Sequence, residues 1–249
     1  MPDPEDRSLL STRRIPRAER LIFALDVPDR ETALRYVDRL GDSVHFYKVG
    51  LELAVTEHYF RLVDELLARG KRVFLDLKLY DVAETVARAV RNLRGREGLC
   101  VTVHAYDAGL RAAVREKGGV KVIAVTVLTS FDRQDLVLQG YPPDVEVEAL
   151  VLSRARRAVE LGCDGIVASA LETRRLREAL GDRCLIVSPG IRPAEGRSAP
   201  DEQKRVATPR EAFLAGVDHI VVGRPIRDAA DPRAMAEKIQ GEIAELFAG

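Results

Sequence analysis

Long apolar runs are missing from this sequence of 249 residues. No segment approaches the roughly 18 consecutive apolar residues that a membrane-spanning helix needs, so we expect no membrane partner. The first 20 residues, MPDPEDRSLLSTRRIPRAER, are polar and charged and contain no apolar segment typical of a secretory signal. We interpret residues 1–20 as a polar leader that precedes the domain, and we expect a cytoplasmic protein.

Paired cysteines and an excess of charge of either sign are also missing. Cys100, Cys163 and Cys184 are far apart and none belongs to a CxxC pair, so we interpret them as small apolar residues of a reducing compartment. Lys and Arg together number 39, and so do Asp and Glu. The chain therefore lacks the basic excess typical of a general nucleic-acid binder, although a local basic pocket for a small anion remains open.

The sequence does contain a regular alternation of short apolar runs and longer amphipathic stretches. The runs are rich in Val, Ile and Leu and almost continuous, which is typical of parallel strands covered on both faces. They predict eight strands, at residues 21–27, 46–52, 72–79, 99–105, 120–129, 165–170, 184–191 and 219–226. Helices are predicted from apolar residues three or four apart, at residues 30–40, 54–70, 82–93, 146–162, 170–181 and 232–247.

This order of elements predicts an α/β protein with one domain, a (β/α)8 TIM barrel over residues 21–249. An open doubly wound sheet is the main alternative, but the glycine-rich G-x-G-x-x-G that would favour it is missing after the first strand, at residues 24–31. Two long polar connections, residues 130–144 and 192–207, follow predicted strands. We expect them at the C-terminal face, where barrel enzymes have their active sites.

Four charged residues lie near the ends of the first three predicted strands. Asp76 and Lys78 are two positions apart in FLDLKLYD, so they share one face of the third strand. Asp26 ends the run LIFAL in the first strand, and Lys48 belongs to the second. Because these strands are neighbours in a closed barrel, we predict that the four side chains converge on its mouth. Acids and bases in alternation neutralise one another, and they provide a cation and a proton donor for a developing carbanion.

The last two predicted strands each end in glycine followed closely by arginine. SPGIRP contains Gly190 and Arg192, and VVGRPI contains Gly223 and Arg224. Loops after strands seven and eight of a barrel frequently bind phosphate, and the planar donor fork of arginine suits that role. We predict a phosphate site there, over which Gln203 of the preceding long loop could close. For either end alone, a turn glycine beside a surface arginine is the alternative interpretation.

Seven segments, FALDV, KVGLEL, FLDLKLYDV, VTVLTS, SPGIRP, DEQKRVATP and VVGRPI, resemble in order the motifs of the orotidine 5'-monophosphate decarboxylase family. The resemblance runs from about Leu21 to the C-terminus. Its most specific part is D-x-K-x-x-D with a lysine one strand earlier, joined to P-G-I-R and V-G-R-P. It implies decarboxylation of orotidine 5'-monophosphate to uridine 5'-monophosphate in pyrimidine biosynthesis, without metal or organic cofactor, by a homodimer with shared active sites.

The resemblance also implies a role for each matching residue. Lys78 would donate the proton to C6 of the pyrimidine, and Asp81 would reach into the partner subunit's site. The implied catalytic residues are Lys48, Asp76, Lys78 and Asp81. The implied substrate-binding residues are Asp26 at the ribose, Thr85 across the dimer, Thr129 or Ser130 at the pyrimidine, and Arg192, Gln203, Gly223 and Arg224 at the phosphate.

Two alternatives to this function remain open. A Mg2+-dependent sugar-phosphate decarboxylase or synthase of the same barrel group shares D-x-K-x-x-D, but carries Glu where this chain has Lys48. A phosphate-binding barrel without catalysis would have no use for the charged residues. The chain departs from the family's usual pattern at Tyr80, at Ala83 and Glu84, and in HAYDAG (104–109). These departures bear on the expected dimer contact, not on the four convergent charges.

Overall fold

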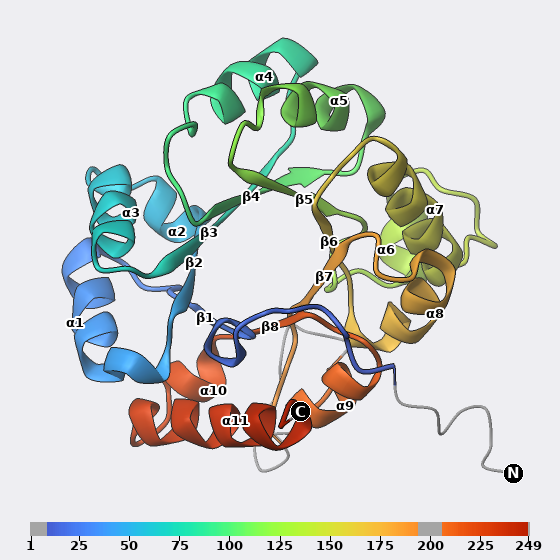
Figure 1. The fold of residues 1–249 in the computed structure, drawn as a ribbon. Helices are drawn as coiled ribbons and strands as arrows, with labels where there is room; N and C mark the ends of the chain where they lie inside the picture. The colour runs from blue at the N-terminus through green and yellow to red at the C-terminus, as the bar shows by residue number, and fades with distance from the viewer. Residues whose placement is uncertain (1–8, 194–205, 249) are drawn as a thin grey trace, which may run out of the picture.

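The computed structural model describes residues 9–193 and 206–248, which form a closed barrel of eight parallel strands surrounded by helices (Figure 1). Each strand pairs with the next in sequence, and β8 pairs with β1. The prediction of a single (β/α)8 barrel is therefore confirmed. The strands are β1 (Leu21–Ala24), β2 (Phe46–Gly50), β3 (Arg72–Leu79), β4 (Leu99–His104), β5 (Lys121–Val125), β6 (Gly165–Val167), β7 (Leu185–Ser188) and β8 (His219–Val222).

Helices alternate with the strands and cover the outside of the barrel. The helices are α1 (Arg30–Leu40), α2 (Leu51–Ala54), α3 (Tyr59–Ala68), α4 (Ala83–Arg91), α5 (Asp107–Glu116), α6 (Arg133–Leu138), α7 (Val147–Glu160), α8 (Ala170–Leu180), α9 (Pro209–Leu214), α10 (Arg224–Arg227) and α11 (Pro232–Leu246). The predicted helix over 54–70 is wrong at its start, because α2 ends at Ala54 and α3 begins at Tyr59. The sequence also missed α5, α6, α9 and α10. Three of these have six residues or fewer, too few for a clear helical period.

Most predicted strands extend too far at their C-terminal ends. β5 ends at Val125, whereas the apolar run continues to Thr129, and β7 ends at Ser188, whereas the run continues to Ile191. An apolar run shows where side chains are buried, but not where the neighbouring strand stops pairing. The extra residues form loops or the starts of helices such as α2 and α10 at the C-terminal face, which is the face that carries the candidate site.

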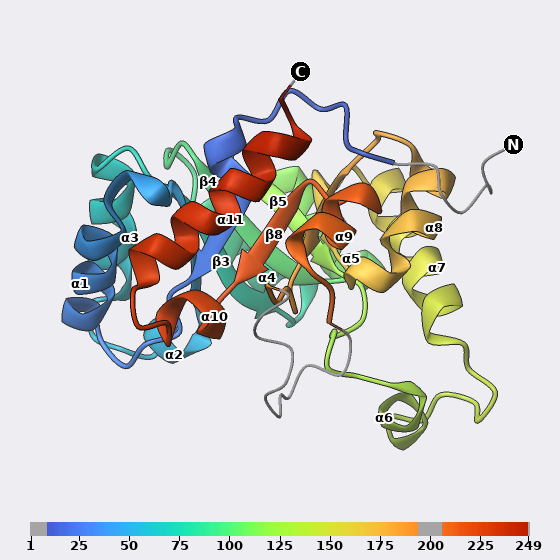
Figure 2. The same cartoon turned by 90° about the horizontal axis from the view of Figure 1, so that it is seen from below.

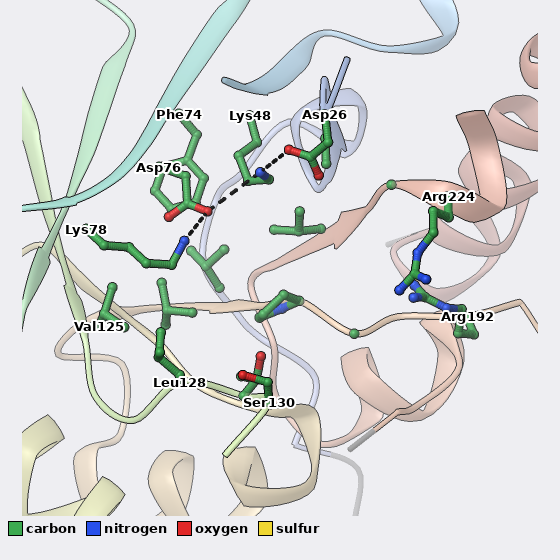
Figure 3. Close-up of a pocket in the computed structure, with 18 of the residues that line it drawn as sticks. Asp26, Lys48, Phe74, Asp76, Lys78, Val125, Leu128, Ser130, Arg192 and Arg224 are labelled. Atoms are coloured by element: carbon green, nitrogen blue, oxygen red, sulfur yellow. Dashed lines mark hydrogen bonds and ion pairs between the residues drawn. The ribbon is translucent and has the colours of Figure 1, made fainter. Parts of the chain in front are cut away.

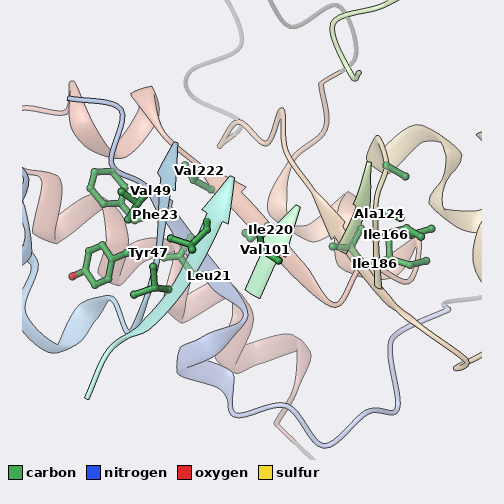
Figure 4. Close-up of a cluster of buried hydrophobic side chains, with 14 of the residues drawn as sticks. Leu21, Phe23, Tyr47, Val49, Val101, Ala124, Ile166, Ile186, Ile220 and Val222 are labelled. Atoms are coloured by element: carbon green, nitrogen blue, oxygen red, sulfur yellow. The ribbon is translucent and has the colours of Figure 1, made fainter. Parts of the chain in front are cut away.

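Alternate strand residues face the helices and the interior of the barrel. Phe23 and Tyr47 belong to the larger core between sheet and helices (Figure 4). Ile22, Phe46 and Phe74 belong to a second cluster, which fills the interior. Packing in that interior is close: a Cβ at Gly165 would lie 2.8 Å from Cβ of Leu185. The interior is therefore lined mainly by apolar side chains below the level at which the charged residues appear.

The described part of the leader, residues 9–20, packs against the end of the barrel opposite to α6 and α10 (Figure 2). The hydroxyl of Ser11 donates to the buried carboxylate of Asp218, which also pairs with Arg177 at 2.7 Å. The guanidinium of Arg20 lies 3.6 Å from the centre of the Phe247 ring. These contacts join residues 9–20 to the barrel at its N-terminal face and leave the C-terminal face open.

Two interpretations made from composition can be compared with the structure. All three cysteines are buried and unpaired, and burial raises the pKa of the Cys100 thiol to about 11, which fits a structural role. Within residues 9–193 and 206–248, no helix combines the length and the apolar character needed to span a membrane.

Candidate active site

A cavity of about 470 Å³ opens at the C-terminal ends of the strands, within the usual size range of ligand sites (Figure 3). Nine of the residues predicted from the sequence line it: Asp26, Lys48, Asp76, Lys78, Thr129, Ser130, Arg192, Gly223 and Arg224. Asp81 and Thr85 are not among its lining residues. Gln203 lies outside the described residues. The single chain therefore brings together most of the predicted site, but not all of it.

Four of these residues form what we call the charged cluster: Asp26, Lys48, Asp76 and Lys78. Nζ of Lys48 lies 2.8 Å from Oδ1 of Asp26 and 3.6 Å from Oδ2 of Asp76. Nζ of Lys78 lies 2.8 Å from the same Oδ2 atom. The predicted convergence is thus found, with the two carboxylates and two ammonium groups in alternation.

Asp76 is the most constrained member of the charged cluster. Its side chain is 14% exposed, and burial by itself would favour the neutral acid. The ammonium groups of Lys48 and Lys78 outweigh that effect, so the pKa of Asp76 lies below its ordinary value. Asp76 is therefore an anion at neutral pH, held between two cations at the edge of a cavity.

Strand β3 is not regular where it carries the charged cluster. Its pairing with β4 shifts register between Leu75 and Leu79, so that it bulges at this point. Lys78 has a φ of 47°, the one positive φ found outside glycine among the described residues. Strained backbone of this kind is costly and concentrates at functional sites. The sequence predicted which face the two side chains share, but not this bulge.

The two arginines predicted at the phosphate end, which we call the arginine pair, lie across the cavity from the charged cluster (Figure 3). Arg192 follows β7 and Arg224 follows β8, and burial lowers the pKa of Arg192 from its ordinary value. A parallel bridge between Ile191 and Ala207 joins the two ends of the long connection beside Arg192. A Cβ at Gly223 would lie 3.3 Å from that of Ala24, so a side chain there would crowd the cavity wall.

Sequence reasoning missed two polar residues of this region. Arg227 lines the cavity beside Arg224, and its Nη1 donates to the backbone oxygen of Asp26 at 2.8 Å. Arg227 lies three residues after Arg224 in GRPIR, which is about one helical turn. This spacing could have indicated that both side chains lie near the same cavity. Thr102 of β4 contacts Asp76 and Lys78 from behind the cavity wall. A threonine within a Val-rich strand gave no such signal.

Asp81 and Thr85 are exposed on the chain's surface. The loop at Asp81 is fixed from one side, because the Tyr106 hydroxyl donates to the backbone oxygen of Asp81. The ring of Tyr80 packs edge-on against Tyr106, with centroids 5.0 Å apart, and against His104. Two of the chain's departures from the family pattern, Tyr80 and Tyr106, thus lie together beside Asp81.

No group of three His, Cys, Asp or Glu side chains in residues 9–193 and 206–248 is arranged to hold a metal ion. In the charged cluster, the ammonium of Lys48 lies between the two carboxylates that a divalent cation would need. The donor set therefore fits a cation supplied by the protein itself.

The fold is a (β/α)8 barrel in which the charged cluster faces the arginine pair across one cavity. The family described as "Orotidine 5'-phosphate decarboxylase / HUMPS family" matches residues 19–239. The chain belongs to this family.

Named relatives agree with this assignment. The chain is 54% identical over 241 residues to orotidine 5'-phosphate decarboxylase of Methylococcus capsulatus, covering 97% of this chain and 98% of that protein. It is 48% identical over 245 residues to the enzyme of the same name from Rhodopseudomonas palustris strain HaA2, which covers 98% of this chain and 97% of that protein. The crystal structure of orotidine 5'-phosphate decarboxylase from Lactobacillus acidophilus superposes with a TM-score of 0.76 at 33% identity, covering 90% of this chain and 99% of that one.

Proposed function

We propose that the protein catalyses the decarboxylation of orotidine 5'-monophosphate to uridine 5'-monophosphate, in the cytoplasm and without metal or cofactor. The observation that carries the proposal is Asp76 held between Lys48 and Lys78, across one cavity from Arg192 and Arg224. Relatives covering almost the whole chain carry the name of this enzyme.

The chemical problem is the loss of CO2 from a ring carbon that has no adjacent electron sink. Enzymes as a class supply about 8–23 kcal/mol of transition-state stabilisation, and an unstabilised carbanion requires the upper part of that range. The ammonium of Lys78 is the group that meets the developing negative charge and then protonates C6. Its ion pair with Asp76, at 2.8 Å, holds this ammonium group at the reacting end of the cavity.

Asp76 and Lys48 prepare the site for this step. The carboxylate of Asp76 is ionised and only partly solvated. In the proposed mechanism it lies beside the substrate's own carboxylate group and repels it. Lys48 bridges Asp76 and Asp26, which links the reacting end of the cavity to the residue assigned to the ribose. The charged cluster is therefore already arranged for the reaction and needs little reorganisation.

The remaining lining residues bind the nucleotide. Arg192 and Arg224 hold the phosphate, with Gln203 of the long loop closing over it, while Gly223 leaves room for close approach. Thr129 or Ser130 forms a hydrogen bond with the edge of the pyrimidine. The phosphate is remote from the bond that breaks, and its binding energy serves to close the loops and orient the ring.

We also propose a homodimer in which Asp81 and Thr85 complete the partner subunit's site. Both residues are exposed and lie outside their own chain's cavity. Asp81 is flanked by Tyr80 and Val82, whose exposed fractions are 74% and 70%. Large apolar side chains exposed on both sides of a charged residue are suited to a second copy of this chain, because contact would bury them.

The test is the ultraviolet absorbance of orotidine 5'-monophosphate mixed with purified protein in EDTA, with Lys78→Ala as the inactive control. We expect the substrate's absorbance to decline and uridine 5'-monophosphate to appear with wild type alone. Turnover that requires added Mg2+ would favour a sugar-phosphate type of mechanism. No turnover under either condition would leave a phosphate-binding barrel as the better description.

A further inference from the structure

Where β3 bulges, three of its residues lie opposite a single residue of β4. Leu75 pairs with Val101, and Leu79 pairs with Val103. Thr102 alone therefore faces the segment Asp76–Lys78, which includes both β3 members of the charged cluster. A bulge of this kind removes backbone groups from their regular sheet partners, and a buried N–H without a partner is costly.

The Thr102 hydroxyl compensates for the missing sheet contact. The backbone N–H of Lys78 donates to Oγ1 of Thr102 at 2.8 Å. Oγ1 in turn lies 3.2 Å from Oδ1 of Asp76 and 3.4 Å from the backbone oxygen of Leu75. Since a hydroxyl has one proton, it donates to the nearer, charged acceptor, Asp76. One fully buried side chain thus accepts from one catalytic residue and donates to the other.

The same contact explains how Lys78 keeps an unfavourable backbone conformation. At a φ of 47°, a residue with a side chain is strained and persists only where its surroundings hold it. The Lys78 N–H is the backbone group that this conformation turns toward Thr102. On its other side Oδ2 of Asp76 accepts from Nζ of Lys78 at 2.8 Å. Thr102, Asp76 and Lys78 therefore form a closed ring of contacts.

We infer that Thr102 is a positioning residue, whose hydroxyl fixes the Lys78 backbone and the Asp76 carboxylate so that the Lys78 ammonium points at the reacting carbon. Thr102 is not among the residues that line the cavity, so it acts through its two neighbours. Its effect on turnover rests on the proposed function, whereas its effect on geometry does not. Sequence patterns for the charged residues leave Thr102 out, because it is an uncharged residue of a mostly apolar strand.

The experiment compares Thr102→Val, which keeps the shape and removes the hydroxyl, with Thr102→Ser, which keeps the hydroxyl. A displacement of about 1 Å at a catalytic group can cost about 100-fold in rate. We expect Thr102→Val to lower kcat by about 100-fold with KM within about threefold of wild type, and Thr102→Ser to restore kcat to within about tenfold. Thr173→Val removes another fully buried hydroxyl, on α8, and serves as the control with unchanged kcat.

Crystal structures of the wild type and Thr102→Val provide a readout that needs no activity. We expect the variant to lose the positive φ at Lys78 and to lengthen the contact between Lys78 and Asp76. The inference is wrong if Thr102→Val keeps the positive φ at Lys78 and the short contact between Lys78 and Asp76. It is also wrong if the wild type is active and Thr102→Val has the same kcat. Thr102→Cys, similar in size but a weak hydrogen-bonding group, replaces Thr102→Val if the latter does not fold. An inactive wild type refutes the proposed function, and the crystal structures still decide the positioning role.

Discussion

Nζ of Lys78 lies 2.8 Å from Oδ2 of Asp76, although one residue separates the two on β3. On a regular strand, residues two apart are about 6.6 Å apart along the chain, and both side chains point straight out of the sheet. The bulge and the positive φ at Lys78 turn its long side chain back toward Asp76. The Asp76 carboxylate and the Lys78 ammonium are therefore held together as one ion pair, and we expect changes to either residue to lower turnover more than nucleotide binding.

Replacing Lys78 by alanine should abolish measurable turnover while nucleotide binding through the arginine pair remains. In the proposed mechanism Lys78 is a positioned general acid, which contributes about 10²–10⁴-fold, and also the cation that faces the carbanion, so we expect a loss of at least about 10³-fold. Steady-state turnover and calorimetric binding of uridine 5'-monophosphate measure the two effects. Lys238→Ala, on outer helix α11, is the control, and near-normal activity of Lys78→Ala would remove Lys78 from the proton-transfer role.

Mixing two inactive variants should restore activity if the site is shared between subunits. An Asp81→Ala subunit still has Lys78, and a Lys78→Ala subunit still has Asp81, so a hybrid dimer contains one intact site. Random exchange makes about half of all dimers hybrid, which gives about a quarter of wild-type activity. Native mass spectrometry verifies the exchange, and a mixture that exchanges yet stays inactive speaks against a shared site.

Arg224→Gln should raise KM for the nucleotide and leave the reaction of the nucleoside orotidine unchanged. A hydrogen bond to a charged group contributes about 1.5–3 kcal/mol, which corresponds to about 10- to 150-fold in affinity. Initial rates with both substrates make the comparison. Arg210→Gln, on the exposed face of α9 where Arg210 pairs with Glu245, is the matched control. An equal effect on nucleotide and nucleoside would mean that Arg224 does not bind the phosphate.

Gly50→Ala should lower kcat without much loss of stability. A Cβ at Gly50 would lie 3.1 Å from Nζ of Lys48 and 3.4 Å from Oδ1 of Asp26, so it would push these two apart. The backbone of Gly50, with φ of −103°, accepts alanine. We expect about a 10- to 100-fold lower kcat, because small displacements of catalytic groups are costly. Gly119→Ala, which has open space around it, should leave kcat unchanged, and a similar loss in both variants would contradict this explanation.

The carboxylate of Glu116 should make stability depend on pH in the acid range. Hydrogen bonds from Arg91 and Arg115 hold its pKa at about 2, against an ordinary value of 4.5. Because the folded-state value is the lower one, this stabilisation is complete above pH 4.5 and is lost as the pH falls toward 2. The free energy of unfolding, measured with urea, should be larger for wild type than for Glu116→Gln above pH 4.5. This difference should become smaller as the pH falls toward 2. Glu31→Gln, in an exposed pair with Arg35, should show little difference at any pH.

Much of the fold and most of the candidate site could be predicted because both follow from periodicity. Alternation along β3 places Asp76 and Lys78 on the interior face, and the order of strands brings Lys48 next to them. Strand ends were predicted less well, because pairing with a neighbour, not apolar character, decides where β5 stops at Val125. Short helices such as α10 carry too few residues for a period to show.

The sequence by itself determined the class of barrel, the faces of its strands and the chemical groups at its mouth, since these depend on local spacing. Only the tertiary structure decided how the groups meet. The bulge at Lys78, the hydroxyl of Thr102 from the adjacent strand and the contact of Arg227 with Asp26 all join residues distant in sequence. Such contacts arise from closure of the barrel, which fixes the register of each strand against its neighbours and so sets distances that spacing along one strand cannot specify.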